Sequence, residues 1–186
     1  MLPNDAGQVL LPIARAAIGG TWGQAPSTAR EDAAWLQDLG ASFVTLTQQG
    51  NLRGCIGSLM ARRSLLADVK ANALAAAFQD PRFTALTEAE LAVTSVEVSV
   101  LSAMADMAFA SEADALAQLR PHIDGVLLES GGHRATFLPQ VWEQLPTPNT
   151  FMAHLKRKAG LPVDFWSPQV RLQRYTVSKW SEAAAP

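Results

Sequence analysis

The sequence predicts an α+β fold with two unequal lobes and sheets that are mainly antiparallel. Two pairs of strand-like segments are each joined by a short turn that contains glycine, which is typical of β-hairpins. The predicted elements run helix, hairpin, helix, strand, helix, hairpin, helix, strand, without the regular strand–helix alternation of a parallel sheet. The order hairpin, helix, strand therefore occurs twice, and we predict one domain over residues 1–186 that consists of two intertwined lobes.

Composition excludes several classes of protein. The 186 residues are 48% hydrophobic and 17% charged, and a net charge of −2 makes nucleic acid an unfavoured partner. The single cysteine, Cys55, excludes an internal disulfide and fits a reducing cytoplasm. The first residues lack the basic start of a signal peptide, and no run of about 18 apolar residues is present to span a membrane. We therefore expect a cytoplasmic protein.

The first predicted element is a helix over residues 5–19. Apolar residues recur there at helical spacing, and Asp5 is the expected N-cap. Pro12 removes one hydrogen bond inside this helix and predicts a kink. We expect residues 20–30 to form a loop and residues 33–38 to form a short helical turn.

A hairpin and a helix follow. Segment 41–47 is rich in β-branched and aromatic residues, and a glycine-containing turn joins it to a second strand within 51–59. Alanine and leucine dominate segment 64–79, which predicts a helix. Thr87 and Glu90 have the spacing of a capping box, which predicts a short helical turn.

The other elements rest on the same signals: β-branched runs, N-caps and turn residues. They are a strand over 93–101, a helix over 111–119, a hairpin of 125–129 and 133–138, a helix over 147–158, a strand over 169–177 and a flexible tail over 181–186.

The strand that contains the only cysteine is the first candidate for chemistry. Strict alternation would place Arg53, Cys55 and Gly57 on one face of this strand. A cation beside a thiol favours the reactive thiolate, so Arg53 is expected to activate Cys55, and Gly57 is expected to leave room for a substrate atom. Gly54, on the other face, is expected to let a ligand or another segment approach the backbone. The alternative is that Cys55 is a small buried apolar residue and the glycines ease tight packing.

Four further residues are candidate site residues. Asp80 and Arg82 follow the second predicted helix, where Arg82 either lines a cleft or pairs with Asp80. A cysteine nucleophile needs a base. The candidate bases are the three histidines, His122, His133 and His154, of which His122 is the one we assign to the site. His122 and Asp124 would supply only two metal ligands, so we predict neither a metal site nor a cofactor.

The sequence resembles the AMME-syndrome candidate protein family. The resemblance is carried first by Leu-Arg-Gly-Cys-Ile-Gly at 52–57, which looks like the family signature. Supporting matches are Asp-Pro-Arg-Phe at 80–83, Val-Glu-Val-Ser-Val-Leu at 96–101 and Leu-Pro-Gln-Val-Trp at 138–142. At 122–125 the chain keeps Asp124 and Gly125 of a family pattern, while His122 stands where the family usually has glycine.

What the resemblance implies is a fold rather than a reaction, because the biochemical activity of the family is not established. Its bacterial members are called AmmeMemoRadiSam system protein A. That name places them beside a Memo-like protein and a radical-SAM protein, which implies these two as partners in a modification pathway.

Three functional hypotheses follow. In the first, Cys55 is the centre of an active or ligand site in a cleft between the two lobes, near the Leu-Arg-Gly-Cys-Ile-Gly strand, and acts on a small molecule. In the second, the same strand belongs to a non-catalytic binding module in which Arg53 contacts a carboxylate or phosphate. In the third, the protein is an adaptor that docks a partner protein through an exposed strand edge or apolar surface.

Overall fold

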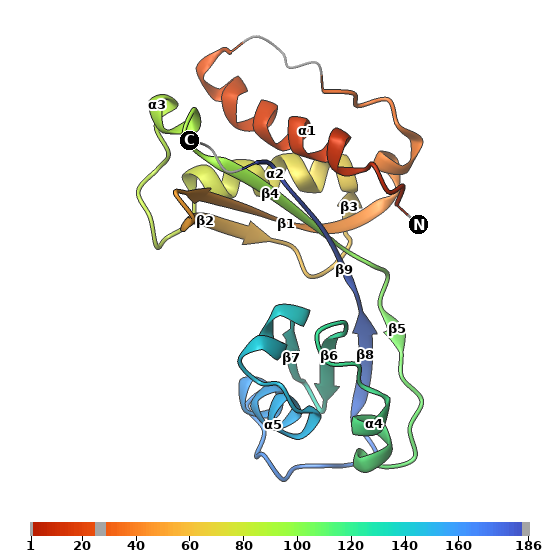
Figure 1. The fold of residues 1–186 in the computed structure, drawn as a ribbon. Coiled ribbons are helices and arrows are strands. Elements are labelled where there is room, and N and C mark those ends of the chain that lie inside the picture. Colours follow the sequence, from red (N-terminus) through yellow and green to blue (C-terminus); the bar gives the residue numbers. More distant parts are fainter. Residues whose placement is uncertain (1, 25–28, 184–186) are drawn as a thin grey trace. The chain divides into compact units, whose positions relative to one another are not determined.

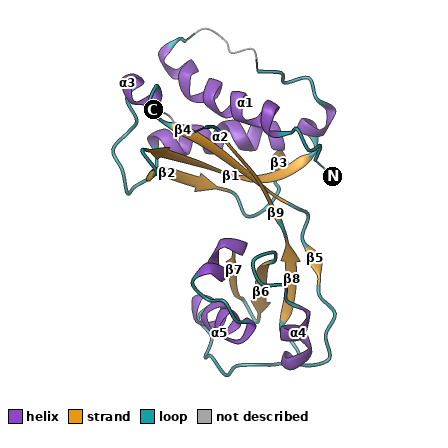
Figure 2. Ribbon diagram, viewed as in Figure 1, coloured by secondary structure: helices purple, strands orange, loops and turns teal. Residues whose placement is uncertain are grey.

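The computed structural model describes residues 2–24 and 29–183 and divides the chain into two compact units. Unit 1 comprises Met1–Leu101 and Ser178–Pro186, and unit 2 comprises Ser102–Val177. Each unit combines helices with an antiparallel sheet, which confirms the predicted α+β class (Figure 1, Figure 2). In the described residues, no helix is both long and apolar enough to cross a membrane.

The first helix of unit 1, α1, comprises Gly7–Gly19. Its N-cap is Ala6 rather than the predicted Asp5, and no side chain caps it. Pro12 is accommodated within the helix, and the apolar stripe that predicted the helix faces the core. The predicted loop that follows starts with a short 3-10 helix, η1, of Gly20–Trp22, while its residues 25–28 lie outside the described part of the chain. The predicted turn near residue 35 is the 3-10 helix η2, Ala34–Gln37.

The other helices of unit 1 begin at the caps that the sequence indicates. Helix α2, Leu65–Phe78, begins after Ser64, whose hydroxyl accepts a hydrogen bond from the backbone N–H of Ala67 at 3.3 Å. Helix α3, Glu88–Leu91, has both hydrogen bonds of the predicted capping box. These starts are predictable because each depends on residues only three positions apart.

The sheet of unit 1 has the strand order β2-β1-β4-β9, and the short strand β3 also pairs with β1. The pairs described residue by residue, β1 with β2, β3 and β4, are antiparallel. The strands are β1 Leu39–Gln48, β2 Asn51–Gly57, β3 Arg63–Ser64, β4 Ser95–Leu101 and β9 Val177–Ser181.

The two faces of this sheet differ. Helices α1 and α2 cover one face, where Val44, Leu46 and Val98 are completely buried in the core (Figure 1). The side chains that alternate with these point to the opposite face, which no helix in the described part of unit 1 covers. We call that side the helix-free face, and its paired residues are Phe43 with Gly57 and Ser99, and Thr45 with Cys55 and Glu97.

Unit 2 has a four-stranded sheet in the order β5-β8-β6-β7, with helices packed on it. Trp142 and Phe151 stack in its core with ring centroids 3.9 Å apart, and both are completely buried. The elements are β5 Ala105–Asp106, α4 Glu112–Gln118, β6 Gly125–Ser130, β7 His133–Phe137, the 3-10 helix η3 Pro139–Glu143, α5 Pro148–Lys158 and β8 Arg171–Tyr175.

The last predicted strand is wrong in its extent. Segment 169–177 contains β8, but a second strand, β9, follows after Thr176 and joins the other sheet. The predicted tail over 181–186 is also wrong at its start, because Glu182 accepts a hydrogen bond from the backbone N–H of Val96 at 2.8 Å and pairs with Arg15 of α1. Residues 184–186 lie outside the described part of the chain.

The two units share one topology. In unit 1 the first hairpin strand, β1, lies between its partner β2 and the later strand β4. In unit 2 the first hairpin strand, β6, likewise lies between β7 and β8. In each unit, helical segments separate the hairpin from that third strand in the sequence. The twofold hairpin, helix, strand order of the sequence is thus a repeat of topology, although the residues themselves do not repeat.

Candidate functional site

A bulge in β2 changes the direction of Arg53. Gly54 pairs with Leu46 and Leu52 pairs with Thr47, so Arg53 is an extra residue opposite β1. A bulge interrupts the alternation of side chains along a strand. The prediction that alternation places Arg53 on the face of Cys55 is therefore wrong.

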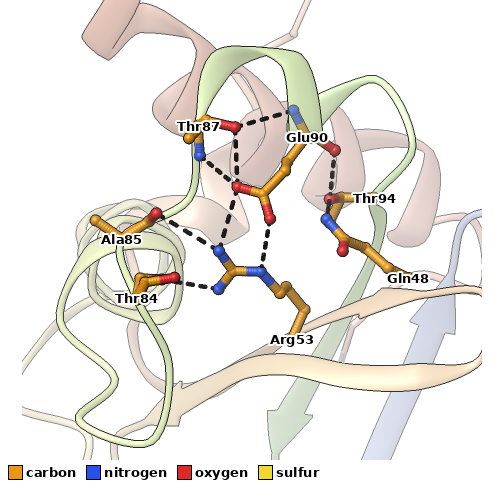
Figure 3. Close-up of polar contacts among 7 residues, drawn as sticks. All are labelled: Gln48, Arg53, Thr84, Ala85, Thr87, Glu90 and Thr94. Carbon is orange, nitrogen blue, oxygen red and sulfur yellow. Dashed lines mark hydrogen bonds and ion pairs between the residues drawn. The ribbon is translucent and has the colours of Figure 1, made fainter.

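Arg53 instead binds the start of α3 (Figure 3). Its Nε donates to Glu90 Oε1 at 3.0 Å, and its Nη1 donates to the backbone carbonyl of Thr84 at 2.9 Å. The second carboxylate oxygen of Glu90 accepts from the backbone N–H and hydroxyl of Thr87. The hydrogen bond from Arg53, aided by the backbone N–H of Thr87, lowers the pKa of Glu90 to about 2. Arg53 thus ties the bulge to α3.

Asp80 and Arg82 hold the backbone of Cys55. They form a bidentate pair, in which Arg82 Nε donates to Asp80 Oδ1 at 2.9 Å and Nη2 donates to Oδ2 at 2.7 Å. Asp80 Oδ2 also accepts the backbone N–H of Cys55 at 2.9 Å, and Arg82 Nη2 donates to the Cys55 carbonyl at 3.2 Å. The hydrogen bond from Arg82 keeps the pKa of Asp80 far below its usual range. The ion pair occupies the free edge of β2 where a further strand would pair.

The side chain of Cys55 lies in a polar row across the helix-free face. Thr45, its partner on β1, donates its hydroxyl hydrogen to Cys55 Sγ at 3.3 Å. Glu97 on β4 is the next residue in the row, and its carboxylate binds Lys179 Nζ at 3.2 Å and the Ser181 hydroxyl at 2.9 Å on β9. We call Cys55, Thr45, Glu97, Lys179 and Ser181 the polar row. It places a half-buried thiol, a hydroxyl, a carboxylate and an ammonium on four neighbouring strands.

Other parts of the protein fill the space next to the two glycines that flank Cys55, Gly54 and Gly57. A Cβ atom on Gly54 would lie 2.1 Å from the backbone oxygen of Ala76 in α2. A Cβ atom on Gly57 would lie 2.2 Å from the ring of Phe43. The expectation that Gly57 leaves room for a substrate atom is therefore corrected, because an aromatic ring fills that space. At Gly54 we expected the approach of either a ligand or another segment of the chain, and the structure shows a segment, helix α2.

Sequence reasoning missed a buried cluster around Asp68 of α2. Its carboxylate accepts from the backbone N–H and hydroxyl of Ser42, the Ser58 hydroxyl, Arg63 Nε and Asn72 Nδ2, at 2.7–2.8 Å in each case. Asp68 and Asn72 are almost completely buried, and they are four residues apart on one helix. The available signal was an Asp and an Asn inside an alanine-rich helix, on the face that meets the sheet. The cluster fixes the segment that leaves β2.

His122 and Asp124 belong to unit 2. His122 is exposed, in a turn with a positive φ of 64°. Asp124 is completely buried, and its carboxylate binds Arg120 through Nε and Nη2, while its backbone carbonyl accepts from Trp142 Nε1 at 2.7 Å. The carboxylate thus closes the turn before β6. A role of His122 as a base for Cys55 stays a prediction, as does a cleft between the lobes.

No group of three or more His, Cys, Asp or Glu residues is placed to hold a metal ion within residues 2–24 and 29–183. All three histidines of the chain lie in unit 2, so the bases that unit 1 itself offers near Cys55 are carboxylates. Asp80 is bound by Arg82, and Glu97 is bound by Lys179.

The fold and the site together define a class of protein: an α+β protein of two units, with Leu-Arg-Gly-Cys-Ile-Gly in an edge strand. The family model that matches residues 11–180 is AMMECR1, and the chain belongs to this family. A protein of Methanothermobacter thermautotrophicus is 37% identical over 146 residues, which cover 75% of this chain and 74% of the relative. A protein of Saccharolobus solfataricus is 33% identical over 94% of this chain and 80% of its own.

The fold is shared with a solved structure. The crystal structure of an uncharacterized protein from Pyrococcus horikoshii matches with a TM-score of 0.81 and 26% sequence identity. The match covers 99% of this chain and 95% of that one. The names of these proteins assign no activity.

Proposed function

We propose that the protein binds a small molecule at the Cys55 end of the polar row, with the Cys55 thiol as its central contact. The observation that carries this proposal is that different residues bind the backbone and the side chain of Cys55. Its backbone N–H and carbonyl are held by Asp80 and Arg82, while its side chain lies on the helix-free face and accepts a hydrogen bond from Thr45. A functional side chain works best when surrounding contacts fix it in this way.

The chemistry of the row favours a polar or electrophilic ligand. Thr45 donates a hydrogen bond to the sulfur, and the Arg82 guanidinium lies at the carbonyl of the same residue, so polar groups surround the thiol. Both carboxylates near Cys55 are already bound by cations, which makes them poor general bases. Binding is therefore the function that unit 1 supports better than catalysis.

Alkylation of the lone cysteine by iodoacetamide tests the proposal, because every adduct reports Cys55. We expect the native protein to be labelled without unfolding, as followed by intact mass with urea-denatured protein as the reference. Thr45→Val should slow native labelling about 3- to 10-fold through loss of the bond to sulfur. Thr47→Val, two residues along the same strand, is the matched control and should leave the rate unchanged. Labelling that occurs only on unfolding would show that Cys55 is a packed structural residue.

Two further proposals concern the cellular location of the protein and its partner proteins. A reduced thiol persists in the cytoplasm, which we take as the location of the protein. The Memo-like and radical-SAM proteins named beside its bacterial relatives stay predicted partners. Co-purification with the tagged chain, compared between wild type and an Arg82→Ala variant, tests whether such partners bind and whether they need the Cys55 region.

A further inference from the structure

Unit 2 contains a hollow of about 630 Å³ at the turn between β6 and β7. Residues of three segments line it: the turn itself, the ends of both hairpin strands, and the segment that enters β8. The volume lies in the range of small-ligand pockets. The lining residues that matter for its chemistry are Glu129, Gly131, Gly132, His133, Arg134 and Arg171.

The charge in this hollow is unbalanced. Glu129 of β6 is paired in register with Arg134 of β7 on one side and Arg171 of β8 on the other. Its carboxylate binds Arg134 Nε at 3.0 Å. The side chain of Arg171 makes no hydrogen bond or ion pair within the described residues. Two guanidinium groups and one carboxylate thus line the hollow, which leaves a net positive charge there.

The turn supplies neutral donors. Gly131 and Gly132 have positive φ values of 54° and 89°, as a two-residue type I′ turn requires. The ladder ends at the pair Ser130–His133, so the N–H groups of the two glycines do not pair across the hairpin. Both glycines are exposed, and a Cβ atom on Gly132 would meet nothing within 4 Å, so the space on that side of the turn is open.

His133 is fixed beside the turn. Its Nδ1 lies 2.8 Å from the backbone carbonyl of Ala159, at the end of α5. A carbonyl oxygen can only accept, so Nδ1 carries the hydrogen and Nε2 is the ring nitrogen left for other contacts. His133 is exposed, but this hydrogen bond fixes the orientation of its ring where it lines the hollow.

We propose that this hollow binds a small oxyanion, a carboxylate or a phosphate group, through the guanidinium groups of Arg171 and Arg134 and the backbone N–H groups of the turn. The planar guanidinium matches both groups through parallel hydrogen bonds. Glu129 holds Arg134 in place when the hollow is empty and competes with the incoming anion. The proposal does not depend on Cys55, which belongs to unit 1.

Titration of the full chain with inorganic phosphate, and separately with acetate, at constant ionic strength tests the proposal. The readout is the amide NMR signals of Gly131, Gly132 and His133. We expect saturable shifts at these residues with at least one of the two anions, and the tighter anion identifies the ligand class. Arg171→Ala should weaken binding about tenfold or more. Arg157→Ala on α5, an exposed arginine outside the hollow, removes the same charge and should leave binding within about twofold.

A second variant gives an effect that misfolding cannot imitate. Glu129→Gln removes the competing carboxylate and should tighten anion binding about 3- to 10-fold. Shifts that never saturate, or that are equal in the Arg171→Ala and Arg157→Ala variants, would overturn the proposal. So would weaker binding by Glu129→Gln.

Discussion

Gly54 of β2 lies so close to Ala76 of α2 that a Cβ atom at residue 54 would be 2.1 Å from the Ala76 carbonyl oxygen. Backbone atoms of a packed helix cannot retreat as a flexible side chain can. We therefore predict that Gly54→Ala lowers the free energy of unfolding by at least about 2 kcal/mol in urea titrations. Gly20→Ala is the matched control, since nothing lies within 4 Å of its Cβ position and its φ is −58°. Equal, small effects of both substitutions would contradict the close approach.

Removal of Asp80 should damage the edge of β2 more than removal of its partner. Asp80→Ala deletes the acceptor of the Cys55 backbone N–H and of three Arg82 N–H groups. We expect a loss of about 2–3 kcal/mol in unfolding free energy and faster hydrogen exchange at the Cys55 amide. Arg82 is half exposed and its replacement by Ala should cost less, because water reaches its site. A larger loss for Arg82→Ala would reverse our assignment of the anchor.

Glu90 should make stability depend on acid pH. Its pKa is lowered from 4.5 to about 2 in the folded protein, chiefly by the hydrogen bond from Arg53. A lowered carboxyl pKa contributes stability that is fully present above the unfolded value and is lost as pH falls through the folded value. Urea midpoints should thus fall as pH drops from about 4.5 to about 2. Glu90→Gln should flatten that part of the profile, and a profile identical to wild type would refute the assignment.

The Asp68 cluster predicts a large effect from an isosteric change. Asp68→Asn keeps the volume of the side chain but turns an NH₂ group toward donors that need an acceptor. Because Asp68 is almost completely buried, we expect a loss of about 3 kcal/mol in unfolding free energy. Ser58→Ala removes one of the donors and should lose about 1 kcal/mol. Thermal and urea unfolding of both variants measure this order, and similar losses would show that the cluster does not act through the carboxylate.

Local signals predicted most of the fold. Ser64, Thr87, Ser111 and Thr147 each accept a hydrogen bond at a helix start, as their spacing indicates. The hairpins were predictable from turn residues, and Gln49 and Gly50 indeed take positive φ values. The split of β8 and β9 was not, because it depends on which sheet each half joins rather than on the residues of 169–177.

The candidate site was predicted by residue type but not by arrangement. A strand pattern cannot show that one extra residue turns Arg53 toward Glu90, since the bulge is set by pairing with β1. The pairing of Asp80 with Arg82 was one of the two alternatives that the sequence left open. Their joint hold on Cys55, 25 residues earlier in the chain, depends on how α2 crosses the sheet.

The insertion of unit 2 between β4 and β9 sets an order of assembly during synthesis. Residues 102–177 form an uninterrupted stretch, so unit 2 has all of its strands once that stretch has left the ribosome. Unit 1 lacks β9 until then, although its other strands are made first. Until β9 is made, the edge of β4 has no partner strand on that side. The Arg15 side chain likewise lacks Glu182, its ion-pair partner in the folded protein. The unit that begins to be made first is therefore the one completed last.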